Sequence, residues 1–233
     1  MTLDLPDAHV DVADLAFLRG DDGVLLVQRS GATASFSRCE FGENAGTGLL
    51  IEGGFAGDVV QVDLESCRFV DNDEHGLFCG PSQVRITMAD CEVTGNGDTG
   101  LFAVSAVLDV QDTMIAGNAA DTGGGASLVA CTAELRRVEF RDNVALERGG
   151  GVSIHATGTY LFDDCTFDAN AAPLAAQAYF HNMEGFTIDA RFNCCDIDTS
   201  EFGGPAWDAG MVAITHEGCT VPVATRSWSA VKA

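Results

Sequence analysis

The sequence predicts an all-β fold, a parallel β-helix of about eight coils with three short strands in each coil. A motif of cysteine, large apolar residue, asparagine and glycine recurs along the chain at similar spacings. No stretch of about 10 to 15 residues shows the apolar periodicity of a helix. Glycine is abundant (27 residues), proline is scarce (5), and 46% of the 233 residues are hydrophobic. A chain of this length and composition can bury one large core.

The repeated motif is clearest in Ser66 to Gly80, SCRFVDNDEHGLFCG. Its asparagine aligns with others at intervals of 22 to 28 residues, and the pattern extends to Gly20 before them and Ser200 after them. The aligned residues are Asn44, Asn72, Asn96, Asn118, Asn143 and Asn170. We expect these asparagines to stack at an inner corner as a ladder, in which each amide bonds its neighbours and the local backbone.

Apolar residues spaced two apart predict the inward faces of the strands, because alternate side chains of a strand share a face. Three residues before each aligned position are Phe17, Phe41, Phe69, Val93, Ile115, Phe140, Phe167 and Ile197. Five residues before are Leu15, Cys39, Cys67, Cys91, Thr113, Val138, Cys165 and Cys195. Pairs such as Phe36 with Ala34, and Leu49 with Ile51, complete the coil. One such unit cannot close a core, but stacked units can.

Charge restricts the partners that we expect. The formal net charge is −23, and Lys232 is the only lysine, so nucleic acid and anionic membranes are disfavoured. We expect no signal peptide in the N-terminal residues and no membrane span, since neither pattern occurs. The prediction is a single domain over residues 1–233, with coils at about 10–205. Residues 206–233 would form a partial coil or C-terminal cap, and the chain would stack on a partner or belong to a longer β-helical protein.

Two further patterns carry a resemblance to a known family. Phe-x-x-Asn occurs four times, and two strands begin with GGGASL (Gly123 to Leu128) and GGGVSI (Gly149 to Ile154). These resemble the repeats of polymorphic outer-membrane-protein and autotransporter-type right-handed parallel β-helices, within the wider pectin-lyase-like superfamily. The resemblance covers about residues 10 to 205 and implies a right-handed coil. It also implies an extracellular or cell-surface location, whereas its functions range from adhesins to polysaccharide lyases and glycoside hydrolases.

The nine cysteines divide into two groups. Those of the inward column are expected to be buried free thiols, because such a thiol behaves as a small apolar side chain. Cys131, Cys194 and Cys219 are the candidates for exposure, and a Cys194 to Cys219 disulfide is the alternative for two of them. No Cys-x-x-Cys pair occurs, so a zinc site is not expected.

Outward-facing acids give the enzyme hypothesis. Asp109 and Glu134 would be neighbours on successive coils, with Arg136 beside them and Asp163 one coil on. The resemblance makes such a cluster the candidate catalytic set of a lyase or hydrolase. The alternative is structural: Arg136 to Asp163 and Arg137 to Asp164 would be ion pairs between coils. The turns are expected to be too short to wall a cleft.

One outward column is apolar. Leu50, Phe78 and Phe102 follow one another there, with Ser127 and Ser153 after them. A stripe of exposed apolar side chains usually marks a contact site, so these three are the candidate binding residues. The alternative is that the segment from Phe55 to Asp58, or a chain end, covers them.

The histidines and turn acids give weaker expectations. The five histidines are expected to occupy different registers, and no two to share a column. The turn acids lack the nonapeptide that binds calcium in another repeat class, so no cofactor is expected, with Ca²⁺ the one ion that they would attract.

The leading functional prediction is a non-catalytic, surface-associated or secreted module, an adhesin or rigid passenger-like domain. Its expected partners are a polysaccharide or a cell-surface protein, with end-to-end or side-by-side self-association. The alternative is a carbohydrate-active enzyme, a polysaccharide lyase or glycoside hydrolase.

Overall fold

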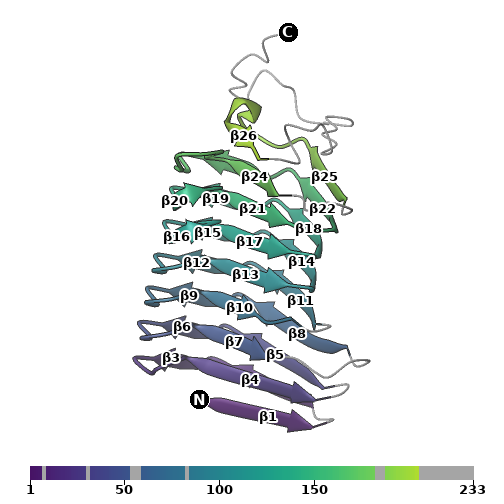
Figure 1. The fold of residues 1–233 in the computed structure, drawn as a ribbon. Helices are drawn as coiled ribbons and strands as arrows, with labels where there is room; N and C mark the ends of the chain where they lie inside the picture. The colour runs from purple at the N-terminus through teal and green to yellow at the C-terminus, as the bar shows by residue number, and fades with distance from the viewer. Residues whose placement is uncertain (7–8, 30–31, 53–58, 82–83, 182–186, 205–233) are drawn as a thin grey trace.

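The computed structural model describes residues 1–6, 9–29, 32–52, 59–81, 84–181 and 187–204. Successive coils stack along one axis into a rod, with the N-terminus at one end (Figure 1). Every pair of neighbouring strands in its sheets is parallel, as a solenoid requires.

Three long sheets run the length of the rod. Sheet A contains β1 (Thr2–Pro6), β4 (Val24–Arg29), β7 (Leu49–Glu52), β10 (Leu77–Cys79), β13 (Leu101–Val104), β17 (Ala126–Val129), β21 (Val152–His155), β24 (Ala178–His181) and β26 (Phe202–Gly203). Sheet B contains β2 (His9–Ala13), β5 (Thr33–Ser37), β8 (Val60–Glu65), β11 (Val84–Ala89), β14 (Val107–Gln111), β18 (Thr132–Arg136), β22 (Gly158–Asp163) and β25 (Ile188–Asn193). Sheet C contains β3 (Ala16–Leu18), β6 (Glu40–Gly42), β9 (Arg68–Val70), β12 (Glu92–Thr94), β15 (Met114–Ala116), β19 (Glu139–Arg141) and β23 (Thr166–Asp168).

The prediction of about eight coils with three strands each is confirmed, since the three sheets hold nine, eight and seven strands. The first strand starts at Thr2, earlier than the predicted start near residue 10, because β1 pairs with β4 and extends sheet A. A fourth, two-stranded sheet, sheet D, was not predicted and joins β16 (Ala119–Thr122) to β20 (Val144–Arg148). A single turn of 3₁₀ helix, η1 (Thr199–Glu201), precedes β26. The predicted cap, with Trp207 and Trp228, lies outside the described residues.

The predicted inward columns form the core. Phe41 stacks on Phe17 on one side and on Phe69 on the other, with ring centroids 5.2 and 4.9 Å apart. The first three cysteines of the inward column are buried and free, as predicted: Cys39, Cys67 and Cys91. Leu15 is the exception at 52% exposure, because it precedes β3, the last strand of sheet C at the N-terminal end of the rod.

The asparagine ladder is present at the corner between sheets C and A. Each amide nitrogen donates to the side-chain oxygen of the next ladder asparagine at 2.8 to 3.0 Å. The same nitrogen donates to the backbone carbonyl of the preceding coil, as Asn96 Nδ2 does to Phe69 O at 3.1 Å. The expected last member, Ser200, does not continue the ladder. Asn170 donates instead to Gln177 Oε1, and Gln177 donates to Glu201 Oε2.

The remaining cysteines differ in part from the prediction. Cys131 is buried and free rather than exposed, and its thiol donates to Ala103 O. Burial raises the pKa of Cys131, and raises the pKa of Cys79 to about 12, so both thiols stay protonated at neutral pH. Cys194 is disulfide-bonded and buried. Its predicted partner, Cys219, lies outside the described residues.

Candidate functional site

The apolar column lies on the outer face of sheet A. Phe78 is in register with Leu50 on one side and with Phe102 on the other, and the flanking residues Leu77 and Cys79 are buried in the core. The two phenyl rings meet edge to face at 5.1 Å. All three outward side chains are half-buried rather than fully exposed, so part of the column is already covered by the protein itself.

His75 provides that cover. It lies in the turn before β10, and its ring is 5.5 Å from the ring of Phe78 and 5.2 Å from that of Phe102. Burial lowers the pKa of His75, against the opposing effect of Asp98 and Glu74. The imidazole is therefore neutral at pH 7 and belongs to the aromatic surface. The other predicted cover, Phe55 to Asp58, lies outside the described residues.

Two hollows meet at His75 and together form what we call the groove. The first, of about 460 Å³, has Leu50 and Phe78 on its floor and Asp21, Asp22 and Glu74 on its rim. The second, of about 590 Å³, continues over Phe102 towards the C-terminal coils. Its other lining residues are Asp98, Thr99, Asp121, Thr122, Ser127, Val129, Arg148, His155, Ala156 and His181. The groove thus follows the axis of the rod over sheet A.

Sheet D builds one wall of the second hollow. Thr122 on β16 and Arg148 on β20 are in register and both line the hollow. The turn is longer after Asn118, Asn143 and Asn170, and the first two of these turns form β16 and β20, to which Ala171 and Leu174 add isolated bridges. The sheet A strand is preceded by a glycine four residues after Asn96, but seven after Asn118 and eight after Asn143. The expectation that all the turns are too short to wall a cleft is therefore wrong at this end of the rod.

Two histidines share a column at the C-terminal end of the groove, contrary to the expectation that no two would. His155 on β21 pairs in register with His181 on β24, and their ring centroids are 5.4 Å apart. Burial, together with the charges of His181 and Arg148, lowers the pKa of His155 to about 4. The groove therefore has acids along its first half and a group of basic side chains at its far end.

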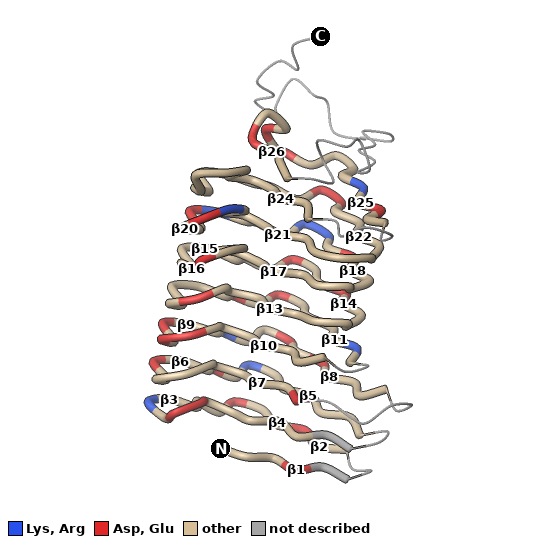
Figure 2. Tube along the Cα trace, viewed as in Figure 1, with Lys and Arg blue, Asp and Glu red and all other residues tan. Residues whose placement is uncertain are grey.

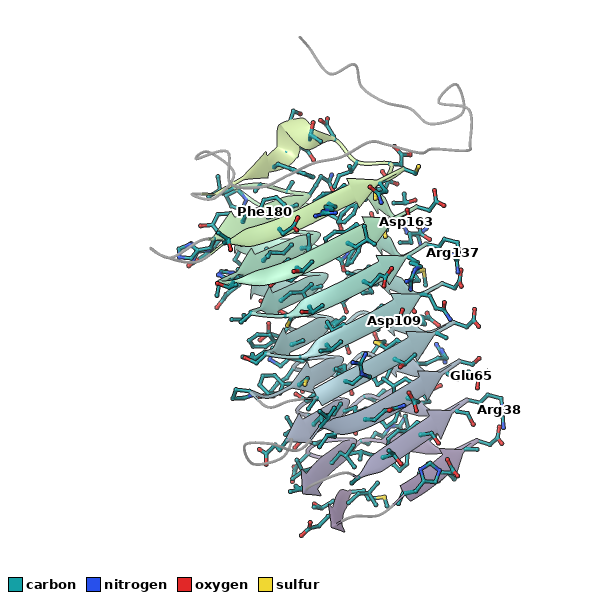
Figure 3. All side chains as sticks on the ribbon, turned by 90° about the vertical axis from the view of Figure 1, so that its right-hand side faces the viewer. Arg38, Glu65, Asp109, Arg137, Asp163 and Phe180 are labelled. Carbon is teal, nitrogen blue, oxygen red and sulfur yellow. The ribbon has the colours of Figure 1, made fainter. Side chains whose placement is uncertain are left out.

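The predicted catalytic cluster lies on another face, the outer face of sheet B, where Figure 3 shows Asp109 and Asp163. Arg136 pairs with Asp109 at 2.9 Å and also with Glu134, which is in register with Asp109. Asp163 is in register with Arg136 on the next coil. The structure thus brings the predicted residues together, but with the two acids engaged by one arginine.

The predicted ion pairs between coils run in the opposite direction. Arg136 pairs with Asp109 rather than Asp163, and Arg137 pairs with Asp112 at 2.6 Å. Each arginine therefore reaches to the preceding coil. Arg38 does the same with Asp14, and Figure 3 shows Arg38 and Arg137 along one edge of this face.

Acidic residues recur at the turns along the rod (Figure 2). Within the described ranges, no three His, Cys, Asp or Glu side chains are grouped so as to hold a metal ion. No helix in those same ranges is long and apolar enough to cross a membrane.

Comparison with known proteins identifies the fold. Residues 19–120 match the family model described as right handed beta helix region. Neither the curated proteins nor the solved structures gave a match to the chain. The structure continues the same coil from the matched stretch to Gly203, through four further strands of sheet A. The likeness to autotransporter repeats remains a resemblance of short motifs. The chain therefore has the fold of a right-handed parallel β-helix.

Proposed function

We propose that this protein is a rigid, non-catalytic binding module whose groove over sheet A holds an extended polymer, and that the polymer is a polysaccharide. The observation that carries the proposal is the continuous surface of Leu50, Phe78, Phe102 and His75 inside the groove. Sugar rings offer apolar C–H faces to aromatic rings and hydroxyl groups to the polar rim.

The length of the groove favours a polymer over a small molecule. The groove extends from Asp22, which precedes β4, to His181 on β24, and these two strands are six spacings apart in sheet A. At roughly 4.8 Å per spacing the distance is about 29 Å, which fits a chain of several sugar units. The strands of the rod are hydrogen-bonded to a neighbouring strand on each side. The protein would therefore lose little conformational entropy when it binds such a chain.

The acids of the groove support binding rather than catalysis. Asp22 Oδ1 accepts a hydrogen bond from Thr47 N at 2.9 Å, and Asp98 Oδ1 accepts one from Thr99 N at 2.7 Å. Both carboxylates thus stabilise turns, and their free lone pairs remain acceptors for ligand hydroxyl groups. The cluster of Asp109, Glu134 and Arg136 lies on a different sheet, so it would not act on a polymer in the groove.

We also propose a surface-associated or secreted location. The disulfide at Cys194 supports this proposal, because disulfides persist mainly in oxidising compartments. A test is to locate the native protein by cell fractionation, with and without thiol alkylation before lysis. Protein found outside the cytoplasm with Cys194 oxidised supports the proposal, whereas cytoplasmic protein with a free Cys194 thiol contradicts it.

A binding screen tests the main proposal. The wild-type protein is measured by affinity electrophoresis and calorimetry against neutral and acidic polysaccharides, with and without Ca²⁺. We expect saturable binding to at least one polymer, without any shortening of it. The matched pair of variants is Phe102→Ser in the groove and Thr87→Ala on the outer face of sheet B. Binding that survives Phe102→Ser, or is lost equally with Thr87→Ala, would exclude the groove as the site.

A further inference from the structure

The C-terminal end of the groove concentrates basic side chains in a protein that has few of them. The chain has 12 Lys and Arg against 35 Asp and Glu. Arg148, His155 and His181 nevertheless line the same hollow. They come from β20 and β21, which follow one another in the chain, and from β24 on the next coil, which pairs with β21. This grouping therefore has to be explained by the fold and not by the composition.

Buried hydroxyl groups orient these side chains. Arg148 Nη1 donates to Tyr179 Oη at 3.3 Å, and its guanidinium lies over the tyrosine ring, 5.1 Å from the centroid. The same hydroxyl is 3.3 Å from His181 Nδ1, and Ser153 Oγ is 2.7 Å from His155 Nε2. Ser153 and Tyr179 are both buried. Each imidazole is thus held through one nitrogen, and its second nitrogen, His155 Nδ1 or His181 Nε2, is on the opposite side of the ring.

Two buried polar atoms in this groove lack a partner. Among the described residues, the buried side-chain nitrogens and oxygens without a hydrogen bond are Arg148 Nε and His75 Nδ1. Both residues line the second hollow. His75 Nδ1 lies 3.8 Å from Asp98 Oδ1, so Arg148 is the residue that keeps an unmet donor at the C-terminal end of the hollow, at a cost in free energy.

The charges around His155 indicate which ligand group fits. His181 and Arg148 both act against protonation of His155, in addition to its burial. Tyr179 faces the ring from β24, at 6.0 Å between centroids. Glu147 pairs with Arg148 at 3.3 Å, but its side chain is 63% exposed. Glu147 therefore neutralises the positive charge of Arg148 only on its solvent side. An anion bound between Arg148 and the two histidines would neutralise it on the side of the hollow.

We infer that this end of the groove is a subsite for a single anionic group, a carboxylate or a sulfate, held by Arg148, His155 and His181. The inference rests on the proposed function where the group is carried by a sugar of the bound polymer. Asp98 and Asp121 line the same hollow and repel further negative charge. The subsite therefore selects a ligand with one isolated anionic group rather than a continuous polyanion.

Sugar probes that differ only in charge test the inference. Glucose, glucuronate and glucose 6-sulfate are titrated at constant ionic strength, and the pKa of His155 is followed by NMR of the imidazole. Sodium acetate and sodium sulfate report binding of the free anion. We expect the anionic probes to raise the pKa of His155 and glucose to leave it unchanged. By linkage, the affinity for glucuronate rises as the pH falls through the raised pKa.

Two variants separate the subsite from the general charge of the protein. Arg148→Gln keeps a hydrogen-bonding side chain and removes the charge, so it should lower the affinity for glucuronate about ten-fold and leave glucose binding unchanged. Arg191→Gln, on the exposed face of sheet B, is the matched control and should change neither.

The outcomes distinguish this inference from the proposed function. Equal binding of glucose and glucuronate, unaffected by Arg148→Gln, would overturn the anion subsite while polysaccharide binding stands. A shift of the His155 pKa with acetate or sulfate, in a protein that binds no polysaccharide, would support the subsite and reject the proposed function. No response of His155 to any anionic probe would overturn the subsite directly.

Discussion

Asn72 donates a hydrogen bond from Nδ2 to Asn96 Oδ1 at 2.9 Å, and the backbone N–H of Asn72 donates to the same oxygen at 3.2 Å. One side-chain oxygen thus satisfies two buried donors of the neighbouring coil. Asn96 Nδ2 in turn donates to Asn118 Oδ1 and to Phe69 O. Each ladder asparagine therefore joins three coils, and its loss affects both neighbours.

We predict that Asn96→Ala lowers the free energy of unfolding by about 1 to 3 kcal/mol, because it leaves buried donors and acceptors unpaired. Urea denaturation monitored by circular dichroism provides the measurement. The outward-facing Thr87→Ala is the control, and it should have little effect. A loss for Asn96→Ala no larger than that of the control would refute the role assigned to the ladder.

The groove gives a second prediction, for a triple variant in which Leu50, Phe78 and Phe102 are each replaced by serine. We expect polysaccharide binding to be abolished in calorimetry and the thermal stability to fall only slightly, because these side chains are half-buried and not part of the core. A loss of several kcal/mol would mean that another segment of the chain packs on the column. The column would then be part of the fold and not a contact site.

The acids of sheet B give a third prediction. Asp109→Asn combined with Glu134→Gln should leave the protein folded, at a cost of about 1 kcal/mol or less, because the ion pairs with Arg136 are partly exposed. Polysaccharide binding should not change. If the wild type depolymerises any polysaccharide and the double variant does not, the enzyme hypothesis is favoured over ours.

A fourth prediction concerns pH. His155 has a pKa of about 4 in the folded protein, lowered from 6.5, so the unfolded chain binds a proton at pH values where the folded protein does not. Stability is therefore lost as the pH falls from about 6.5 towards 4, by on the order of 3 kcal/mol at most for this group. His155→Gln should remove that part of the pH dependence. Parallel stability curves for wild type and variant between these pH values would contradict it.

The sequence predicts the coil and the ladder well, and the groove less well, for a physical reason. Inward-facing residues lie three and five positions before each ladder asparagine from Asn44 to Asn170, two apart from one another. Their register can therefore be counted along the sequence. The wall of the groove depends on extra turn residues after Asn118 and Asn143, which fold into β16 and β20. Their length is visible in the sequence, but pairing between two neighbouring insertions is a property of the stacked coils.

The paired histidines show where counting fails. His155 ends a strand that begins after Gly151, whereas the strand of His181 begins after Gln177, with no glycine to fix its register. In the structure Gln177 takes over the end of the ladder by accepting from Asn170, which places Ala178 beside Val152 and His181 beside His155. A glutamine seven residues after the last ladder asparagine is the feature that would have located this column.

The most direct test of the account is to map the ligand site on the wild-type protein by NMR. Oligosaccharides of a polysaccharide bound in the screen are titrated into labelled protein, and the shifts of backbone amides are assigned to the sheets. We predict that the shifts concentrate in β7, β10, β13, β17 and β21 of sheet A, together with β16 and β20. Shifts centred on β14 and β18 of sheet B, around Asp109 and Glu134, would contradict the claim that the groove is the binding surface.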